Sequence, residues 1–343
     1  MLILTETDLR SALKMREVID AIELGFRALA QENAFAPARL AMDLPGSDAV
    51  LLAMPAYLRL GAWASRPQHG EGATSEETER ASLGTKIVGV FPRNTECSLD
   101  VVQATYLLLD ADTGVALSLM DGRFITAIRT AATSAVATKV MATPGPKQLA
   151  VFGAGVQARF HIEAMIEVAD IRKVMLVERA TDKGLALAEQ VRKLHGLACE
   201  VVSAEDAASQ ADLICTCTSS PAPLFDGAII KAGTHINAVG AFTPETRELD
   251  TETVRRSRVI IDAESAAGRE AGEILIPLAE GAIDASHVKG TLSEVVSGTV
   301  AGRESAGEIT LFKSCGLAIE DLVTARLAYD RATSSSIGTR VEF

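Results

Sequence analysis

The feature that most constrains the fold of this chain is a glycine-rich turn between an apolar run and a helical stretch. The apolar run at 149–152 leads directly into Gly153-Ala154-Gly155-Val156-Gln157-Ala158. Glycine lets the backbone turn sharply and approach a ligand, and the helix predicted over 158–168 presents free N–H groups above the turn. The order of strand, turn and helix predicts a site for a pyrophosphate.

A second strand and an acidic residue extend this pattern. The apolar run at 174–177 ends at Glu178, where a dinucleotide fold places the acid that binds the adenosine ribose. A glycine motif alone is a weak signal, and here its third place is an alanine. The full order of elements within about thirty residues is more specific. We therefore predict a dinucleotide site that includes Gly153, Gly155, Val156, Gln157, Ala158 and Glu178.

The residue after Glu178 leaves the choice of dinucleotide open. Arg179 can pair with a 2′-phosphate, whereas Glu178 would repel one. NAD(H) and NADP(H) are both candidates, and Glu178 favours NAD(H).

Composition narrows the class of protein. The chain has 343 residues, of which 48% are hydrophobic and 23% charged, which is ample for two domains with buried cores. Its formal net charge is -12 and no basic run occurs, so a nucleic-acid partner is not expected.

Cysteine usage and the start of the chain bear on compartment and metal binding. The five cysteines lack the spacing of a metal site or a disulfide framework, so we expect buried thiols and no metal. Met1 is followed by no charged region, long apolar run or cleavage site, so we expect a cytoplasmic protein without a membrane anchor.

The middle of the chain alternates strands with helices from about residue 145 to 262. Such regular alternation predicts an α/β domain with a doubly wound parallel sheet of the Rossmann type. The expected strands are at 149–152, 174–177, 200–202, 213–216, 235–239 and 259–261.

The flanking parts differ from this pattern and predict an α+β layer. A helix is expected over 11–33 with its cap at Thr5 or Thr7, and 309–332 has helical periodicity, so it can cross back to the first domain. The polar segment 62–84 is interpreted as a surface loop, with a lid as the functional alternative. Strands are expected at 40–44, 50–54, 86–91, 104–109 and 116–120.

Two residues of the first part invite a chemical role. Lys86 opens an apolar strand, so it is either a solvated strand end or a group aimed into a cleft. Arg129 precedes the small-residue helix at 130–135, and a guanidinium near a helix start can clamp a carboxylate with two hydrogen bonds. Arg39 follows Pro37 in a loop and carries no signal of its own.

Motifs spread over nearly the whole chain carry a family resemblance. They lie at 54–57, 86–94, 110–114, 129–132, 153–158, 247–250 and 312–321. In these motifs the sequence resembles the ornithine cyclodeaminase and mu-crystallin family.

The resemblance implies a homodimer with two domains per subunit. Residues 1–125 plus 318–343 would form the substrate-binding and dimerisation domain, and 126–317 the Rossmann domain that binds a nicotinamide cofactor. Arg39 and Arg129 would hold an amino acid carboxylate. Lys86 would lie beside the reacting carbon or imine as the catalytic proton relay. Further cofactor contacts would come from Thr218, Val239, Gly240 and Ser314, although a helix-capping serine would look the same as Ser314.

One departure from the family favours a particular reaction. Ornithine cyclodeaminases carry an aspartate where Phe242 stands, and that acid is expected to handle the terminal amine of the substrate. With Phe242 the pocket loses an acid and gains an apolar wall. This suits the NAD(P)H-dependent reduction of a cyclic ketimino acid, Δ1-pyrroline-2-carboxylate or Δ1-piperideine-2-carboxylate, to L-proline or L-pipecolate.

Three alternatives stay open. The first is an ornithine cyclodeaminase, which would form proline and ammonia without net cofactor turnover. The second is a dehydrogenase of an open amino acid such as alanine. The third is a binding protein of the mu-crystallin type, which would hold NADPH and a small ligand without turnover.

Overall fold

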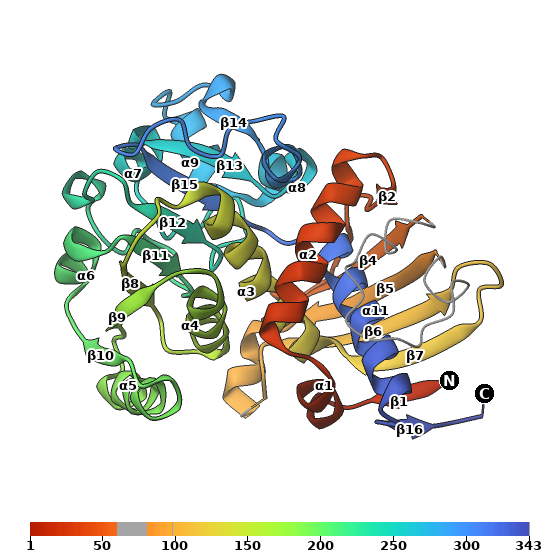
Figure 1. Cartoon of the computed structure of the whole chain (residues 1–343). Helices are drawn as coiled ribbons and strands as arrows, with labels where there is room; N and C mark the ends of the chain where they lie inside the picture. Colours follow the sequence, from red (N-terminus) through yellow and green to blue (C-terminus); the bar gives the residue numbers. More distant parts are fainter. Residues whose placement is uncertain (60–80, 98, 343) are drawn as a thin grey trace. The chain divides into compact units, whose positions relative to one another are not determined.

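The computed structural model describes residues 1–59, 81–97 and 99–342. The chain forms two compact units (Figure 1). Unit 1 comprises Met1–Arg129 and Leu317–Phe343, and unit 2 comprises Thr130–Gly316. The boundaries of the predicted domains, 1–125 plus 318–343 and 126–317, lie close to these.

Unit 1 contains a mixed sheet in the order β16-β1-β7-β6-β5-β4-β2, with β3 paired to β4. Its central strands are antiparallel, whereas β1 pairs with β7 in parallel. The strands are β1 (Leu2–Leu4), β2 (Ala34–Phe35), β3 (Leu40–Asp43), β4 (Val50–Leu58), β5 (Ser82–Val90), β6 (Val102–Asp110), β7 (Ala116–Asp121) and β16 (Thr339–Arg340).

Helices cover one face of this sheet. Helix α11 (Ala318–Ser334) packs against β4, β5 and β6, and α2 (Met15–Ala30) packs against α11, as Figure 1 shows. The other helical elements of the unit are α1 (Glu6–Ala12), the first part of α3 (Gly122–Met141) and a 3-10 helix at Pro92–Cys97.

The predicted helix over 11–33 is confirmed at 15–30, where α2 lies, but its start was wrong, because residues 6–12 form a separate helix, α1. Leu13 has extended backbone angles and ends α1. Thr5 caps α1, and its hydroxyl accepts from the backbone of Asp8, whose carboxylate accepts from Thr5 in return. The capping signal was therefore read correctly, but it belongs to the shorter helix.

Unit 2 is a Rossmann-type α/β fold, as predicted. Its sheet has the order β10-β9-β8-β11-β12-β15-β13-β14, and every pair of strands is parallel. The strands are β8 (Lys147–Phe152), β9 (Ile171–Val177), β10 (Ala198–Val201), β11 (Leu213–Thr216), β12 (His235–Ala238), β13 (Ser257–Ile261), β14 (Val288–Thr291) and β15 (Ile309–Lys313).

Helices connect these parallel strands. They are α4 (Val156–Val168), α5 (Thr181–His195), α6 (Ala204–Gln210), α7 (Thr251–Arg256), α8 (Glu264–Glu270), α9 (Gly272–Ala279) and α10 (Leu292–Ser297). Two short 3-10 helices lie at Gly227–Ile229 and Ala285–His287.

The strand order of unit 2 reverses at β8. The chain passes from β8 to β9 and β10 on one side, then returns to β11 and β12 on the other. Ligands of open parallel sheets bind outside the carboxyl ends of the strands at such a switch point. The glycine turn follows β8 and therefore lies at this edge.

Two predicted segments differ from the structure. Residues 309–313 form β15 instead of helix, because a short apolar run that is buried on both sides has no period that separates strand from helix. Of the predicted loop 62–84, residues 82–84 belong to β5, while 60–80 lie outside the described residues.

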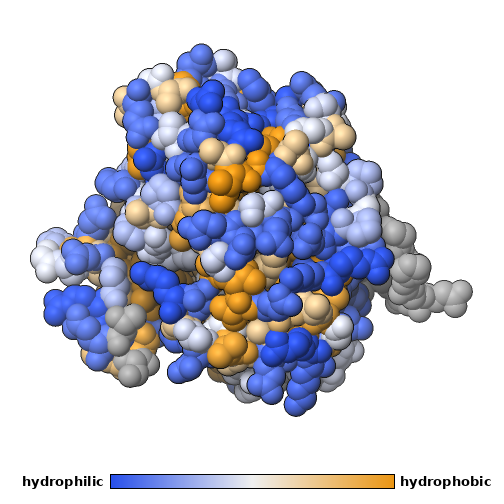
Figure 2. All heavy atoms as spheres, turned by 90° about the vertical axis from the view of Figure 1, so that its left-hand side faces the viewer, coloured by the Kyte–Doolittle hydropathy of each residue, from blue (hydrophilic) through white to orange (hydrophobic). Residues whose placement is uncertain are grey.

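Surface properties fit the composition. Figure 2 shows a face covered mainly by hydrophilic residues, with hydrophobic residues in separate patches. In the described part of the chain, no helix combines the length and the apolar character needed to span a membrane. Cys199 and Cys215 are buried free thiols as expected, but Cys217 and Cys315 are only partly buried and Cys97 is exposed.

Candidate active site and cofactor edge

Lys86 lies in the interior of β5 and is almost fully buried, with an exposed fraction of 1%. Alternation along the strand places it on the buried face with Gly84 and Val88, so the interpretation as a solvated strand end was wrong. Its ammonium lies 2.9 and 2.8 Å from the two carboxylate oxygens of Asp321 and donates to Thr126 Oγ1 at 3.2 Å.

Arg129 lies inside α3, whose first residue is Gly122, so the prediction that it lies near a helix start was wrong. The helix begins eight positions earlier than the small-residue segment suggested because residues 122–129 are helical as well. The guanidinium is buried and donates from Nη1 to Glu320 Oε2 at 2.6 Å and from Nε to Asp321 Oδ1 at 3.1 Å.

The structure therefore brings Lys86 and Arg129 together around one acidic pair at the start of α11. Glu320 and Asp321 are both fully buried, and Asp321 contacts both cations. Burial lowers the pKa of the Lys86 ammonium to about 8, although the Asp321 carboxylate acts in the opposite direction. A group with this pKa exchanges its proton near neutral pH.

Sequence reasoning missed the part played by Glu320 and Asp321. Both were noted within a family motif, without a role. The available signal was the occurrence of two adjacent acids on a helix that is otherwise mostly apolar, since acids in such a place are buried only when they are paired.

Arg39 lies in the connection between β2 and β3 and is partly exposed. Its predicted contact with a substrate carboxylate stays a prediction.

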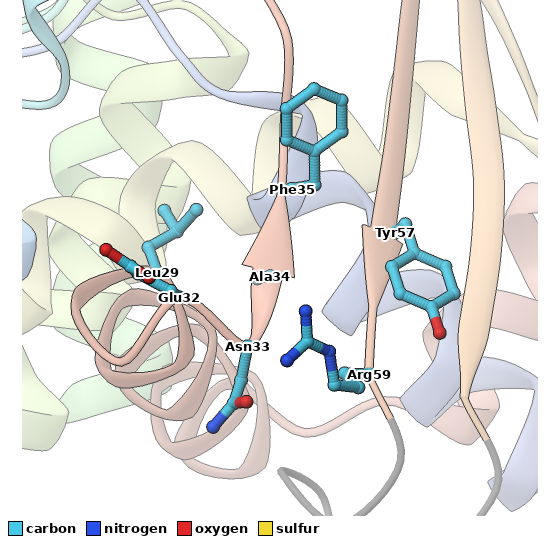
Figure 3. Close-up of a pocket in the computed structure, with 7 residues that line it drawn as sticks. All are labelled: Leu29, Glu32, Asn33, Ala34, Phe35, Tyr57 and Arg59. Carbon is cyan, nitrogen blue, oxygen red and sulfur yellow. The ribbon is translucent and has the colours of Figure 1, made fainter.

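A cavity of about 380 Å³ lies elsewhere in unit 1, between α2, β2 and β4 (Figure 3). None of Arg39, Lys86 and Arg129 lines it. The lining residues are Leu29, Glu32, Asn33, Ala34, Phe35, Tyr57 and Arg59.

In unit 2 the glycine turn has the geometry of a phosphate site. Gly153 has a φ of +103°, and a Cβ added there would lie 2.7 Å from the carbonyl oxygen of Cys217, so only glycine fits. Gly155 is the N-cap of α4, and a Cβ there would meet nothing within 4 Å. The first N–H groups of α4, at Val156, Gln157 and Ala158, follow directly.

Glu178 ties the end of β9 to this turn. One carboxylate oxygen accepts from the Ala154 N–H and the other from the Ala180 N–H, both at 2.9 Å. The neighbouring Arg179 is exposed.

The other predicted cofactor residues follow the carboxyl ends of neighbouring strands. Thr218 follows β11, Val239 and Gly240 follow β12, and Ser314 follows β15. Ser314 is buried and donates to Asp262 Oδ2 at 3.2 Å. It does not cap α11, whose N-cap is Leu317, so the capping alternative was wrong.

Two further residues lie near the carboxyl ends of the strands of unit 2. Phe242, in the loop after β12, is 43% exposed. Glu248, which sequence reasoning quoted only within a motif, is fully buried and accepts hydrogen bonds from Thr218 and Gly240.

Comparison with known proteins identifies the family that the sequence of this chain matches. Residues 73–336 match the model of the ornithine cyclodeaminase/mu-crystallin family. The chain is 34% identical to a Δ1-pyrroline-2-carboxylate reductase of Bacillus cereus over 345 aligned residues, which cover 100% of both chains.

Two solved structures are similar over the whole length. The Δ1-pyrroline-2-carboxylate reductase of Thermococcus litoralis, in complex with NADH and L-proline, has a TM-score of 0.90 and 39% identity, covering 99% of this chain and 100% of that one. An archaeal alanine dehydrogenase dimer with bound NAD has a TM-score of 0.88 and 31% identity, covering 100% and 99%.

Proposed function

Because the chain belongs to the ornithine cyclodeaminase/mu-crystallin family, we propose that it is an NAD(H)-dependent reductase of a cyclic ketimino acid. The substrate is Δ1-pyrroline-2-carboxylate or Δ1-piperideine-2-carboxylate, and the product is L-proline or L-pipecolate. The observation that carries the proposal is the buried pair of cations, Lys86 and Arg129, in a chain whose relatives act on such an imine.

The proposed reaction needs one hydride and one proton. The hydride passes from NADH to the carbon of the C=N bond, and the nitrogen takes up the proton, so that NAD⁺ and the amine are formed. Lys86 has a pKa of about 8 and can supply the proton or stabilise the charge that develops on nitrogen. Arg129 and Arg39 hold the substrate carboxylate.

The proposed clamp has to work within the charge balance of the Lys86 cluster. Lys86 and Arg129 offset Glu320 and Asp321, so the substrate carboxylate brings the next negative charge. The site can accommodate the substrate carboxylate when the Arg129 guanidinium shares its N–H donors between Glu320 and the substrate. A planar guanidinium with five N–H donors is suited to such sharing.

We therefore predict that Arg129→Lys raises KM for the imine by about thirtyfold or more, with a smaller effect on kcat, because lysine keeps the charge but loses the paired donors. Steady-state kinetics at saturating NADH measure both constants. Arg123→Lys is the matched control, since Arg123 lies on the same helix and also pairs with two carboxylates, those of Asp100 and Asp121. Equal KM values for the two variants would contradict the clamp.

In this proposal, unit 2 supplies the residues that bind the cofactor. The pyrophosphate of NAD(H) binds over the N-terminus of α4 at Gly153 and Gly155, with the N–H groups of Val156, Gln157 and Ala158. Glu178 binds the adenosine ribose, and Thr218, Val239, Gly240 and Ser314 lie along the edge toward the nicotinamide. NADH and NAD are the cofactors bound to the two similar structures.

The proposed role of Glu178 predicts a change in cofactor preference. Glu178→Gln removes the charge that repels a 2′-phosphate, so the ratio of NADPH to NADH dissociation constants should fall by about tenfold or more. Titration of nicotinamide fluorescence with each cofactor gives the ratio. Arg179→Gln serves as the neighbouring control and should weaken NADPH binding instead. An unchanged ratio in Glu178→Gln would remove Glu178 from cofactor selection.

The proposal extends to a homodimer formed by unit 1. The sheet face opposite α11 carries apolar side chains that alternate with the buried ones, including Leu83, Leu107 and Leu119. Ile87 is 49% exposed and Leu40 67% exposed. An apolar face of this kind is typical of a subunit contact, and the similar alanine dehydrogenase is a dimer.

The five free cysteines suit a reducing compartment, so we place the enzyme in the cytoplasm.

The first test of the function is NADH oxidation with the five-membered and the six-membered imine in parallel. Rapid oxidation with either imine supports the reductase. Pyruvate with ammonia tests the alanine dehydrogenase alternative, which the similarity to the archaeal enzyme favours. Ornithine with NAD, assayed for ammonia, tests the cyclodeaminase, and Phe242 favours a negative result there. NADPH and ligand binding without any turnover would replace the reductase by a binding protein.

A further inference from the structure

A single buried carboxylate holds the two loops that follow β11 and β12. Glu248 Oε2 accepts from Thr216 Oγ1 at 2.7 Å and from the Gly240 N–H at 2.8 Å. Glu248 Oε1 accepts from the Thr218 N–H at 2.7 Å and from Thr218 Oγ1 at 2.6 Å. All four partners donate, and an ionised carboxylate has two oxygens that accept from all of them. Burial raises the pKa of Glu248, while the hydrogen bonds from Thr218 and Thr216 and the nearby Lys313 ammonium act in the opposite direction.

A second buried pair keeps Glu248 in place. The Glu248 N–H donates to Glu273 Oε1 at 2.9 Å, and Glu273 Oε2 lies 2.9 Å from the Lys313 ammonium. Lys313 also donates to the Ala241 carbonyl, next to Gly240. All three charged residues are fully buried. Burial lowers the pKa of Lys313, but Glu273, Cys315 and Glu248 together outweigh this effect, so the net shift of the pKa is upward and the ammonium stays charged.

The loops held by Glu248 lie at the switch-point edge of the sheet. Thr218 and Gly240 follow β11 and β12, and the glycine turn after β8 packs against Cys217, since a Cβ on Gly153 would lie 2.7 Å from its carbonyl oxygen. There is no room for a side chain at Gly240 either, because an added Cβ would lie 2.6 Å from Glu248 Oε1. The loops after β8, β11 and β12 are therefore packed closely against one another.

We propose that Glu248 is a positioning residue for hydride transfer, a role that rests on the proposed function. Its carboxylate fixes the backbone of the loops after β11 and β12, along which the nicotinamide half of the cofactor is bound. Glu273 and Lys313 fix Glu248 in turn. The effect on the reaction passes through Thr218 and Gly240, because misplacement of a reacting group by about 1 Å is enough to cost about a hundredfold in rate.

The decisive variant is Glu248→Gln. Glutamine has the same shape, but its NH₂ group must face either Gly240 and Thr216 or the two donors of Thr218, so one loop loses its acceptor. We expect the NADH dissociation constant to rise by about tenfold and kcat to fall by on the order of tenfold to a hundredfold, with KM for the imine nearly unchanged. The primary deuterium isotope effect on kcat with NADH deuterated at C4 should increase.

The matched control is Glu294→Gln. Glu294 also accepts from a threonine N–H and hydroxyl, those of Thr291, but it caps α10 away from the switch point. It should lower stability toward urea without changing NADH binding or the isotope effect. If Glu248→Gln does not fold, Thr216→Val takes its place, because it removes one donor to Oε2 in an otherwise equal shape.

The outcomes separate the two proposals. A wild-type protein that binds no NADH in a fluorescence titration overturns the proposed function itself. A wild type that binds NADH and reduces the imine, with a folded Glu248 variant whose NADH affinity and isotope effect match it, overturns the positioning role alone. Thr216→Val is judged by the same two measurements.

Discussion

Lys86→Met is expected to lower kcat for imine reduction by about a thousandfold, while the NADH dissociation constant stays within about twofold of the wild type. Loss of a positioned proton donor typically costs a factor of about a hundred to ten thousand. The variant should remain folded, because Asp321 keeps the hydrogen bond from Arg129 Nε. Methionine also fills most of the buried space that the lysine stem occupied.

The dependence of kcat/KM on pH, compared between the wild type and Lys86→Met, tests the same prediction independently. If the ammonium form of Lys86 is the active one, kcat/KM of the wild type falls as the pH rises through about 8, the pKa that burial imposes. The residual rate of Lys86→Met should lack this step. Lys147→Met is the matched control, a buried lysine that donates to Thr143 and Pro144 in unit 2 and that should keep full activity. Unchanged kcat in a folded Lys86→Met would remove Lys86 from the mechanism.

Asp321→Ala is expected to destabilise the protein by about 3–5 kcal/mol, the largest loss of stability among the variants considered. The substitution leaves the ammonium of Lys86 buried without its carboxylate and deprives Arg129 of one of its two carboxylate partners. Urea unfolding followed by circular dichroism measures the change. Asp330→Ala on the same helix is the control, because its pair with Arg326 is partly exposed and should contribute less than about 1 kcal/mol.

A double variant identifies the cause of this loss. In Lys86→Met, Asp321→Ala the unpaired ammonium is gone, so the double variant should be more stable than Asp321→Ala alone. If the losses of the two single variants simply add, the ion pair is not the source of the effect.

The fold of unit 2 could be predicted because its signals are local. The glycine turn, the helix after it and the acid at the end of β9 lie within one short stretch, and each has a physical reason to occur there. β15 was predicted as helix because the helical period of α11 was extended back over 309–313, a short apolar run buried on both sides that carries no period of its own. The place of β15 between β12 and β13 is decided by the whole sheet.

The candidate site was less accessible to sequence reasoning. Lys86 and Arg129 could be selected by the family resemblance, but nothing near them in the sequence indicates that both pair with Asp321, which lies 235 residues after Lys86. Glu248 presents the same difficulty, since Thr216 and Gly240 come together with it only once β11 and β12 are adjacent. Partners of buried charges are set by tertiary structure, which a reading of local patterns does not contain.

The segment 309–334 has a consequence for how the chain is made. It contributes β15 to the interior of one sheet and then α11, with Glu320 and Asp321, to the core of the other unit. On the ribosome these residues emerge after nearly all of their partners. Until then the sheet of unit 2 lacks the strand between β12 and β13. Lys86 and Arg129 likewise lack the carboxylates with which they pair. Nascent chains that stop before this segment therefore have two incomplete cores and are substrates for chaperones and proteases.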